Sequence, residues 1–326
     1  MLVFRLASVH CIHRFMCEGK EMEGADSRPW DDLLPDALGL IFKNLSLREK
    51  LTVIPVVCKS WSKVVTGPYC WQEIDIEGWS HGTDPYGNAP AKVDKMLRVL
   101  ITRSSGSLRT LCVSGLKLES TFQFILEHVH SLQTLKLPRS AISDSLMESN
   151  AQKLSTLTYL DLSYCSKIGA GAMEAIGKNC KSLARLSRNM HPLDVEGKLS
   201  QNDEAHAIAT TMPKLKHLEM AYHLVDTKGV LDIINSCPDL EFLDLRGCWE
   251  VKLDEQYLKE TSPNLTVLGP QVVDHYEEIS WECCSDYSDS LYDYDSDMIW
   301  DDEDRLEMRF YAGSSEETAY GWPPSP

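Results

Sequence analysis

Cysteine and histidine are the residues of this chain with the most potential for catalysis or metal binding. The sequence holds eleven cysteines and ten histidines, and a thiol beside an imidazole can act as a nucleophile. Cys165 and Cys248, however, stand at positions of a leucine repeat where a small buried side chain is expected. The sequence contains no glycine-rich phosphate loop, nucleophile elbow or HExxH motif. These observations predict a non-enzymatic protein without catalytic residues, metal site or cofactor.

The N-terminal segment holds four possible metal ligands, His10, Cys11, His13 and Cys17, within eight residues. No predicted element holds them in place, so they are weak evidence for a metal site. The segment is basic before Glu18, as in some organelle-targeting peptides, but we expect residues 1–28 to be an unstructured extension. The odd number of cysteines and the lack of a CxxC pair indicate reduced thiols, and hence a protein of the nucleus and/or cytoplasm.

The charge of the chain is concentrated at one end. Of the formal net charge of −17, residues 274–326 carry −14, with sixteen Asp and Glu against two Arg. This composition predicts an acidic, mostly disordered tail. Its interspersed Tyr and Trp residues leave open that it docks on a basic surface. The lack of a long basic run argues against a nucleic-acid partner, and no apolar run reaches the roughly 18 residues that a membrane span needs.

A leucine pattern recurs through residues 107–273. The pattern is L-x-x-L-x-[LVM], with a cysteine three residues later in two copies, and the steps between copies are 24 to 32 residues. It predicts an α/β solenoid of leucine-rich repeats, with parallel strands inside and helices outside. Helices are expected at 171–180 and 227–236, and a bulging loop at 188–203, where Arg188 replaces an apolar residue. The leading leucines of the copies are Leu108, Leu132, Leu157, Leu183, Leu215, Leu240 and Leu265.

The side chains between the leucines are candidates for binding a partner, because alternate residues of each strand point away from the core. Aromatic residues just past the strands are further candidates, because aromatic side chains often anchor interfaces. The substrate-binding candidates are Tyr159, Asp161, Tyr164, Tyr222, Asp244, Arg246 and Trp249. The same face is expected to carry Arg109, Gln133, Lys136, Arg185, Lys216, Glu219 and Glu241.

Residues 29–76 predict three short helices with more apolar surface than they can bury among themselves. The first begins near Pro35. The second follows a capping box made by Ser46 and Glu49 and is ended or kinked by Pro55. The third runs from Val56 to Val65. Residues 77–106 are expected to form a linker and the start of the solenoid.

This N-terminal module resembles the F-box. The resemblance rests on Leu34-Pro35, Ile41-Phe42, Val57-Cys58-Lys59-Ser60-Trp61 and Trp71. With the repeats behind it, the chain is similar to plant F-box/leucine-rich-repeat proteins. The resemblance implies that the F-box binds a Skp-family adaptor, and through it a cullin and a RING subunit, while the repeats hold a protein substrate for ubiquitination and proteasomal degradation. The implied adaptor-binding candidates are Leu34, Pro35, Leu38, Ile41, Leu45 and Val57.

Two other functions stay open from the sequence. One is a leucine-rich-repeat scaffold without ubiquitination output, and the other is an acidic tail that binds basic proteins. Trp61 and Trp71 are expected in internal packing and at the seam with the first repeat. Some members of the family bind an inositol phosphate or a small hormone, and the few basic residues on the predicted strand face favour neither here.

Overall fold

A parallel β-sheet built from the leucine repeats organises most of this protein. The computed structural model describes residues 33–77, 89–191 and 200–271. Within them, eight strands follow one another across the sheet in chain order, and every neighbouring pair is parallel. The strands are β1 Glu73–Asp75, β2 Thr110–Cys112, β3 Thr134–Lys136, β4 Tyr159–Asp161, β5 Arg185–Ser187, β6 His217–Glu219, β7 Phe242–Asp244 and β8 Thr266–Leu268.

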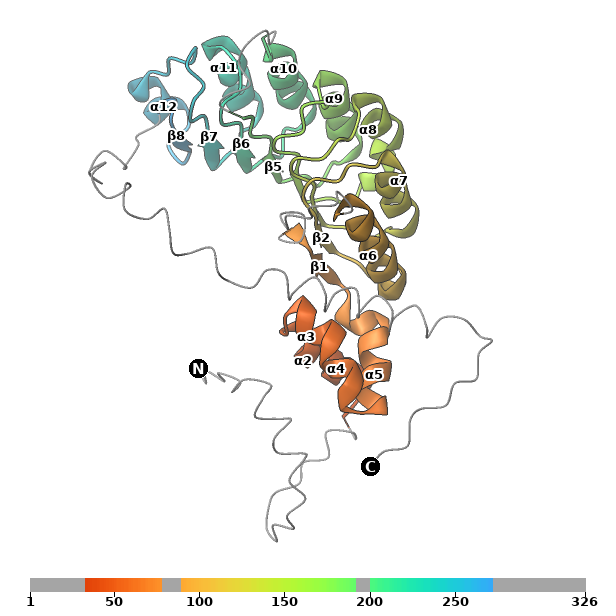
Figure 1. Cartoon of the computed structure of the whole chain (residues 1–326). Helices are drawn as coiled ribbons and strands as arrows, with labels where there is room; N and C mark the ends of the chain where they lie inside the picture. The colour runs from red at the N-terminus through yellow and green to blue at the C-terminus, as the bar shows by residue number, and fades with distance from the viewer. Residues whose placement is uncertain (1–32, 78–88, 192–199, 272–326) are drawn as a thin grey trace, which may run out of the picture. The chain divides into compact units, whose positions relative to one another are not determined.

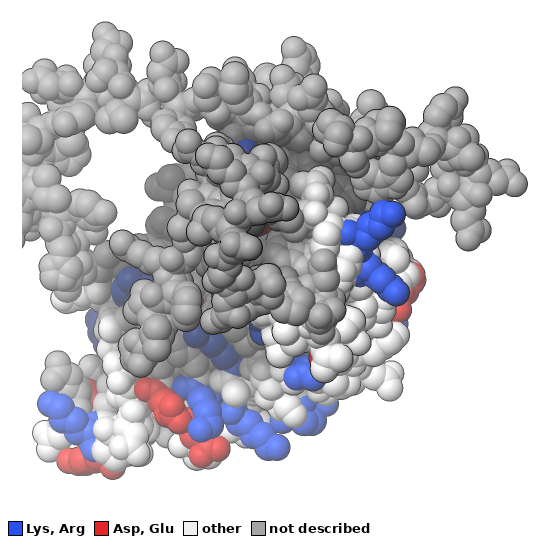
Figure 2. Space-filling model, turned by 90° about the horizontal axis from the view of Figure 1, so that it is seen from below, with Lys and Arg blue, Asp and Glu red and all other residues white. Residues whose placement is uncertain are grey.

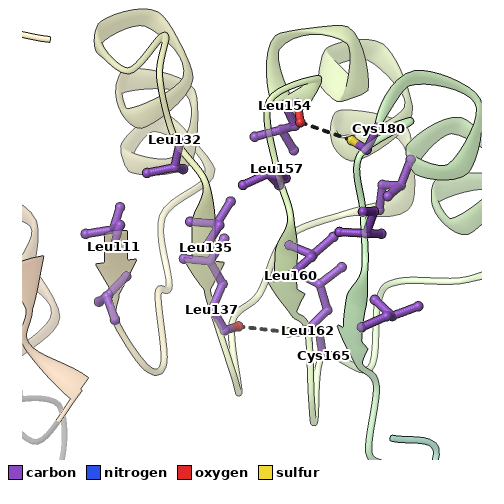
Figure 3. Packing of buried hydrophobic residues seen from close by; sticks show 14 of the residues in the cluster. Leu111, Leu132, Leu135, Leu137, Leu154, Leu157, Leu160, Leu162, Cys165 and Cys180 are labelled. Carbon is purple, nitrogen blue, oxygen red and sulfur yellow. Dashed lines mark hydrogen bonds between the residues drawn. The ribbon is translucent and has the colours of Figure 1, made fainter. Parts of the chain in front are cut away.

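The register of the sheet places the repeated leucines opposite one another. Leu111, Leu135 and Leu160 pair along the sheet, and their side chains point toward the helices (Figure 3). Each repeat thereby continues the core of the one before it. The seven predicted strands are confirmed. The additional strand β1 belongs to the end of the N-terminal module, where the resemblance to the F-box implies a strand after Trp71.

The helices of the repeats lie along one side of the sheet (Figure 1). The α/β solenoid with helices on its outer side is therefore confirmed. The helix expected at 227–236 is found with the same bounds, and the one expected at 171–180 begins and ends one residue earlier. A 16-residue helix, α6, occupies part of the predicted linker. The elements are α6 Ala89–Ser104, α7 Glu119–His128, α8 Asp144–Asn150, the 3-10 helix η4 Ala151–Leu154, α9 Ala170–Asn179, α10 Asn202–Thr211, α11 Thr227–Ser236 and α12 Glu255–Thr261.

Buried cysteines link neighbouring repeats through their thiols. The Cys165 thiol donates to the carbonyl oxygen of Leu137 at 3.1 Å, and the Cys180 thiol to that of Leu154 at 3.1 Å (Figure 3). Burial raises the pKa of Cys165 to about 11 and the pKa of Cys180 to about 12. These thiols therefore stay protonated near neutral pH, which suits a structural role and not a nucleophilic one.

The N-terminal module contains four short helices where three were predicted. They are followed by a 3-10 helix, and their bounds are α2 Pro35–Lys43, α3 Leu47–Thr52, α4 Ile54–Val57, α5 Lys59–Thr66 and η2 Pro68–Cys70. The capping box of Ser46 and Glu49 is present. The single helix predicted from Val56 to Val65 is wrong, because Cys58 adopts an extended conformation and its Sγ accepts the Trp61 N–H at 3.4 Å. Pro55 lies in the first turn of α4 and does not terminate α3.

Trp71 joins the N-terminal helices to the first repeats. Its side chain is fully buried, and its Nε1 donates to the Val65 carbonyl at 2.7 Å. Lys50 and Arg103 lie over its ring, 5.5 and 5.9 Å from the centroid. Because β1 follows Trp71 and pairs with β2, the N-terminal module continues into the sheet.

Arg188 breaks the repeat pattern without leaving the core. Its side chain is completely buried, and its Nε lies 3.1 Å from Oε2 of Glu204, whose side chain is 8% exposed. Its Nη2 donates to the Ile168 carbonyl at 2.7 Å. The loop predicted at 188–203 therefore does not begin at Arg188, and α10 starts at Asn202. Residues 192–199 of that loop, the N-terminal extension and the acidic tail lie outside the described residues.

Candidate protein-binding surfaces

The short N-terminal helices expose large apolar side chains. Leu40 and Ile41 on α2 are 66% and 41% exposed, and Val56 on α4 is 65% exposed. Leu34, just before α2, is 69% exposed. Phe42 on the other side of α2 is buried and packs against Trp61, with 5.0 Å between the ring centroids. The module therefore has a core of its own, and the exposed apolar side chains are available to a partner.

A polar network covers the face of the sheet that points away from the helices. Glu219 on β6 is its centre. Oε1 of Glu219 lies 2.7 Å from Nη2 of Arg185 and 2.9 Å from Nε2 of His217, and Oε2 accepts from the Asn189 amide at 3.1 Å. Burial alone would raise the pKa of Glu219, but the hydrogen bonds from Arg185, His217 and Asn189 together lower it.

Aromatic rings extend this network over five strands. The Tyr159 ring lies between two cations, with the Arg185 guanidinium 4.6 Å and the Lys136 ammonium 5.2 Å from its centroid. His217 stacks on Phe242 with 4.2 Å between centroids and an interplanar angle of 8°. We call these seven residues the strand-face network: Lys136, Tyr159, Arg185, Asn189, His217, Glu219 and Phe242.

The strand-face network is held in place before any partner binds. Each of its side chains is partly buried, and hydrogen bonds or ring contacts fix its rotamer, which lowers the entropy lost on binding. Nε of Arg185 is buried and has no hydrogen-bond partner among the described residues. Tyr and Arg are also the residue types that most often dominate interface energetics.

Comparison with known proteins identifies the two modules. The sequence profile of the F-box domain matches residues 30–73, and that of the leucine-rich repeat matches residues 153–177. The F-box protein FBW2 of Arabidopsis thaliana is 54% identical over 306 residues, which cover 92% of each chain. The F-box proteins SKIP1 and SKIP19 of the same plant are 32% and 31% identical, over 70% and 71% of this chain and 81% and 74% of their own lengths. This chain belongs to the plant F-box/leucine-rich-repeat family.

Membership of the family supports a general role as a substrate-recognition subunit of a Skp–cullin–F-box complex. Such subunits are generally non-catalytic. The F-box implies binding of a Skp-type adaptor.

The structure sorts the predicted adaptor-binding residues of the F-box by exposure. Leu34, Pro35 and Ile41 are exposed, and Leu45 and Val57 are half-buried. Their role as adaptor contacts stays a prediction. The structure corrects the prediction that Leu38 contacts the adaptor. Leu38 is completely buried on the inner side of α2, one turn before Phe42, and offers no surface to a partner.

Sequence reasoning missed Leu40 and Val56 on the F-box. Leu40 lies off the apolar stripe of α2, on the side where a polar residue is expected. An apolar residue on the polar side of an amphipathic helix was the signal that could have revealed it.

The strand face also differs in part from the prediction. Tyr159 belongs to the network, and Asp161 lies beside it with a pKa that burial raises. The structure corrects the prediction that Asp244 contacts a substrate. Its side chain is only 4% exposed, and both of its oxygens accept hydrogen bonds from Arg246, the closest at 2.6 Å. Asp244 therefore positions Arg246 and does not itself face a partner.

Tyr164, Tyr222 and Trp249 lie in the turns that follow β4, β6 and β7. Tyr164 is 37% exposed and Trp249 is 64% exposed, while Tyr222 is half-buried. Their role in substrate binding stays a prediction.

The repeats also carry functional candidates that sequence reasoning did not name. His217, Phe242 and Asn189 belong to the strand-face network but were not predicted. The register shows that the third and fifth residues of each L-x-x-L-x-L unit face outward. The candidates named from the sequence include such residues, for example Tyr159 and Asp161, together with second residues such as Lys216, but not the third residues His217 and Phe242.

Charge on the visible molecular surface is mixed. Figure 2 shows Lys and Arg interspersed with Asp and Glu among the described residues, without one large patch of either sign. In the described ranges, no group of three or more His, Cys, Asp or Glu is placed to hold a metal ion. None of the helices placed by the structure is both long and apolar enough to cross a membrane.

Proposed function

We propose that this protein recruits a protein substrate to a Skp–cullin–F-box ubiquitin ligase for ubiquitination and proteasomal degradation. The observation that supports this most is the direct continuation of the F-box into the repeat sheet. The F-box exposes Leu40, Ile41 and Val56, and the sheet that starts at β1 presents the strand-face network. One chain thus offers two surfaces of different chemistry for two partners.

The adaptor side of the proposal uses the apolar side chains of the F-box. An apolar partner that covers the exposed Leu, Ile and Val side chains removes their apolar area from water. This stabilises the complex by about 25 cal/mol per Å² of apolar area buried. We place Leu34, Pro35 and Ile41 in this contact and add Leu40 and Val56. The adaptor would in turn connect the chain to a cullin and a RING subunit, and we expect the complex in the nucleus and/or cytoplasm.

The substrate side of the proposal uses the strand-face network. Its Tyr159, His217 and Phe242 rings offer apolar area, while Arg185 and Lys136 offer hydrogen-bond donors. A partner segment with acceptor groups and apolar side chains suits this surface. The chain contributes no chemistry of its own, since holding a substrate near a charged conjugating enzyme raises the local concentration of the reacting groups.

A binding experiment with purified Skp-family adaptor tests the adaptor side. The full chain is compared with a Leu40→Asp/Val56→Asp variant and with a matched Leu118→Asp/Leu268→Asp variant. Leu118 and Leu268 are also exposed, at 47% and 38%, but lie in the repeats. We expect the wild type and the repeat variant to bind equally, and the F-box variant to bind at least about tenfold more weakly.

Two results would overturn the adaptor side. Equal binding by the F-box variant would remove Leu40 and Val56 from the contact. A folded wild-type chain that does not bind the adaptor at all would remove the ligase-subunit function and favour a scaffold.

A cellular experiment tests the degradation output. Proteins captured by the wild type are compared with those captured by an Arg185→Ala/Tyr159→Ala variant, and their abundance is measured when the F-box variant replaces the wild type. A substrate should be captured by the wild type, lost from the Arg185/Tyr159 variant, and stabilised when adaptor binding is lost. Captured proteins whose abundance and ubiquitination never change would instead support a scaffold without ubiquitination output.

A further inference from the structure

The turns after strands β2 to β7 are built on the same backbone hydrogen bond. The residue at this turn donates its N–H to a carbonyl of the next repeat. Arg139 donates to Ser163 at 2.8 Å, and Tyr164 donates to Asn189 at 2.7 Å. The equivalent residues in the other repeats are Gly115, Met190, Tyr222 and Gly247, with distances of 2.8 to 2.9 Å.

This turn position requires a left-handed backbone in most repeats. Gly115 and Gly247 have φ of 69° and 76°, a region that glycine occupies without steric conflict. Arg139, Tyr164 and Tyr222 have φ of 56°, 61° and 61° at the same position. A side chain with a Cβ is disfavoured there, and such strain in a native structure suggests a functional constraint.

The strained residues lie among aromatic and basic side chains. The Arg139 guanidinium lies 5.3 Å from the centroid of the Tyr164 ring, which also makes an edge contact with His191. A Cβ built on Gly247 would collide with the Tyr222 ring, so the glycine makes room for the tyrosine. We call the following set the turn rim: the residues Arg139, Tyr164, His191, Tyr222 and Trp249, with the exposed lysines Lys117, Lys167 and Lys252 in the same loops.

The chain passes into its acidic segment at the end of this rim. The Pro270 carbonyl accepts the Gly247 N–H at 2.9 Å, which is the last bond of the turn series. One residue later the described chain ends, and residues 274–326 carry a net charge of −14 and ten Tyr, Trp and Phe residues. The described chain therefore ends beside a surface whose Arg, Lys and aromatic side chains, with the exposed Glu250 among them, suit the charge and aromatic content of the segment.

We propose that residues 274–326 dock on the turn rim of the same molecule. Acidic side chains of the segment would pair with Arg139, Lys167 and the neighbouring lysines, and its rings would pack on Tyr164, Tyr222 and Trp249. The segment would then be an intramolecular competitor for any acidic partner that approaches this edge of the repeats. The proposal does not depend on adaptor binding or on degradation.

The length of the segment is sufficient for this docking. Strands lie about 4.8 Å apart, so the rim from β8 to β3 extends over roughly 24 Å. An unstructured chain of about fifty residues has a root-mean-square end-to-end distance of roughly 40 Å. A tethered segment of this kind reaches millimolar effective concentrations at its site, so even weak contacts suffice.

Photocrosslinking in the full-length protein tests the proposal. A benzoylphenylalanine replaces Tyr164 on the rim or, as the control, Tyr257 on α12. Both tyrosines are 37% exposed, and Tyr257 is nearer in sequence to the segment. We expect crosslinks from position 164 to peptides of 274–326 at about five times the yield from position 257, independent of protein concentration. The yield should fall in salt, as the screening length shortens from about 10 Å at 0.1 M to about 3 Å at 1 M.

Charge reversal separates docking on the rim from general attraction. The Lys117→Glu/Arg139→Glu/Lys167→Glu variant should lose the crosslinks. A control with the same change in net charge reverses residues near the opposite ends of the strands, Arg109→Glu/Lys153→Glu/Lys214→Glu, and should keep them. Circular dichroism confirms that both variants fold.

Several outcomes would overturn the proposal. Equal yields from positions 164 and 257 would mean that the segment does not select the rim. Yields that rise with protein concentration would assign the rim to a second copy of the chain. Equal loss in both charge-reversal variants would leave only non-specific attraction.

Discussion

Removal of Glu204 should destabilise the repeats far more than removal of an ordinary carboxylate. The Arg188 side chain has no accessible surface, and Glu204 is the acidic partner of its guanidinium, with Nε 3.1 Å from Oε2. Glu204→Ala leaves the guanidinium buried with carbonyl oxygens but without a counter-charge. Breaking a buried ion pair in this way costs about 3–5 kcal/mol of the free energy of unfolding.

Replacing both members should recover most of that loss. Leu137, Leu162 and Leu245 occupy the position of Arg188 in other repeats, so Arg188→Leu restores the usual residue. In the Arg188→Leu/Glu204→Leu variant no buried charge remains, and apolar replacement of a buried pair is often neutral or stabilising by about 1–4 kcal/mol. We therefore expect the free energy of unfolding of the double variant to lie within about 2 kcal/mol of the wild-type value or above it. The effects of the two single changes on stability would then be strongly non-additive.

Urea unfolding of the full chain, followed by far-UV circular dichroism, measures these differences. The control is Glu174→Ala on α9, which removes the exposed Lys178–Glu174 pair, with side chains 61% and 52% exposed, and is expected to change stability by less than about 1 kcal/mol. A loss of stability in Glu204→Ala no larger than in Glu174→Ala, or simple addition of the effects of Arg188→Leu and Glu204→Leu, would refute the role of the buried pair.

Three further predictions concern packing, thiol chemistry and acid stability. Gly177→Ala should lower the free energy of unfolding by about 1–3 kcal/mol, because the new Cβ would collide with Thr211 across the α9–α10 contact. Adding Thr211→Ala, which removes the Oγ1 atom nearest to the new Cβ, should reduce the loss, and an absence of any loss in a urea titration would contradict this contact. Burial raises the pKa of Cys165 to about 11, so Cys165 should resist iodoacetamide at pH 8 in the native protein and react after unfolding. Mass spectrometry measures the labelling, and rapid labelling of the native protein would contradict the burial of Cys165. The pKa of Glu219 in the folded state lies below its usual value near 4.5, so its contribution to stability is present above that value and is lost as pH falls through the lowered pKa. Glu219→Gln should flatten the fall in melting temperature below about pH 4.5, and an unchanged pH profile of the melting temperature would refute this prediction.

The strands were predictable because three independent constraints coincide in each repeat. The leucine spacing, the alternation of side chains and the 24- to 32-residue period all select the same residues. The helix Thr227–Ser236 was predicted with its bounds, and Asp226 explains its start, since its side chain accepts the Gly229 N–H at 2.8 Å. Cys58 was not recognised as a helix start, because cysteine is not among the residues that usually cap helices.

The binding surfaces were less predictable, because exposure depends on what covers a face. The apolar stripe of α2 identified Leu38 as apolar but did not show that it lies inside, while Leu40 is outside. The stack of His217 on Phe242 forms only because β6 and β7 pair with these two residues opposite each other. Neither residue suggests the other in the sequence, where they are separated by a full repeat.

Deviations from the repeat pattern contain information that could have been used before the structure was known. Overlaying the copies places Arg188 in a leucine column, and Arg139, Tyr164 and Tyr222 in a column that holds glycine in two other repeats. Each deviation has an energetic cost, through a buried charge or a left-handed backbone. These four residues lie in or next to the repeats of β3 to β6, which also carry Arg185 and Glu219. Because a repeat protein supplies its own internal reference, a residue that is costly at its position and differs from the leucine or glycine of other copies indicates a special packing or binding role.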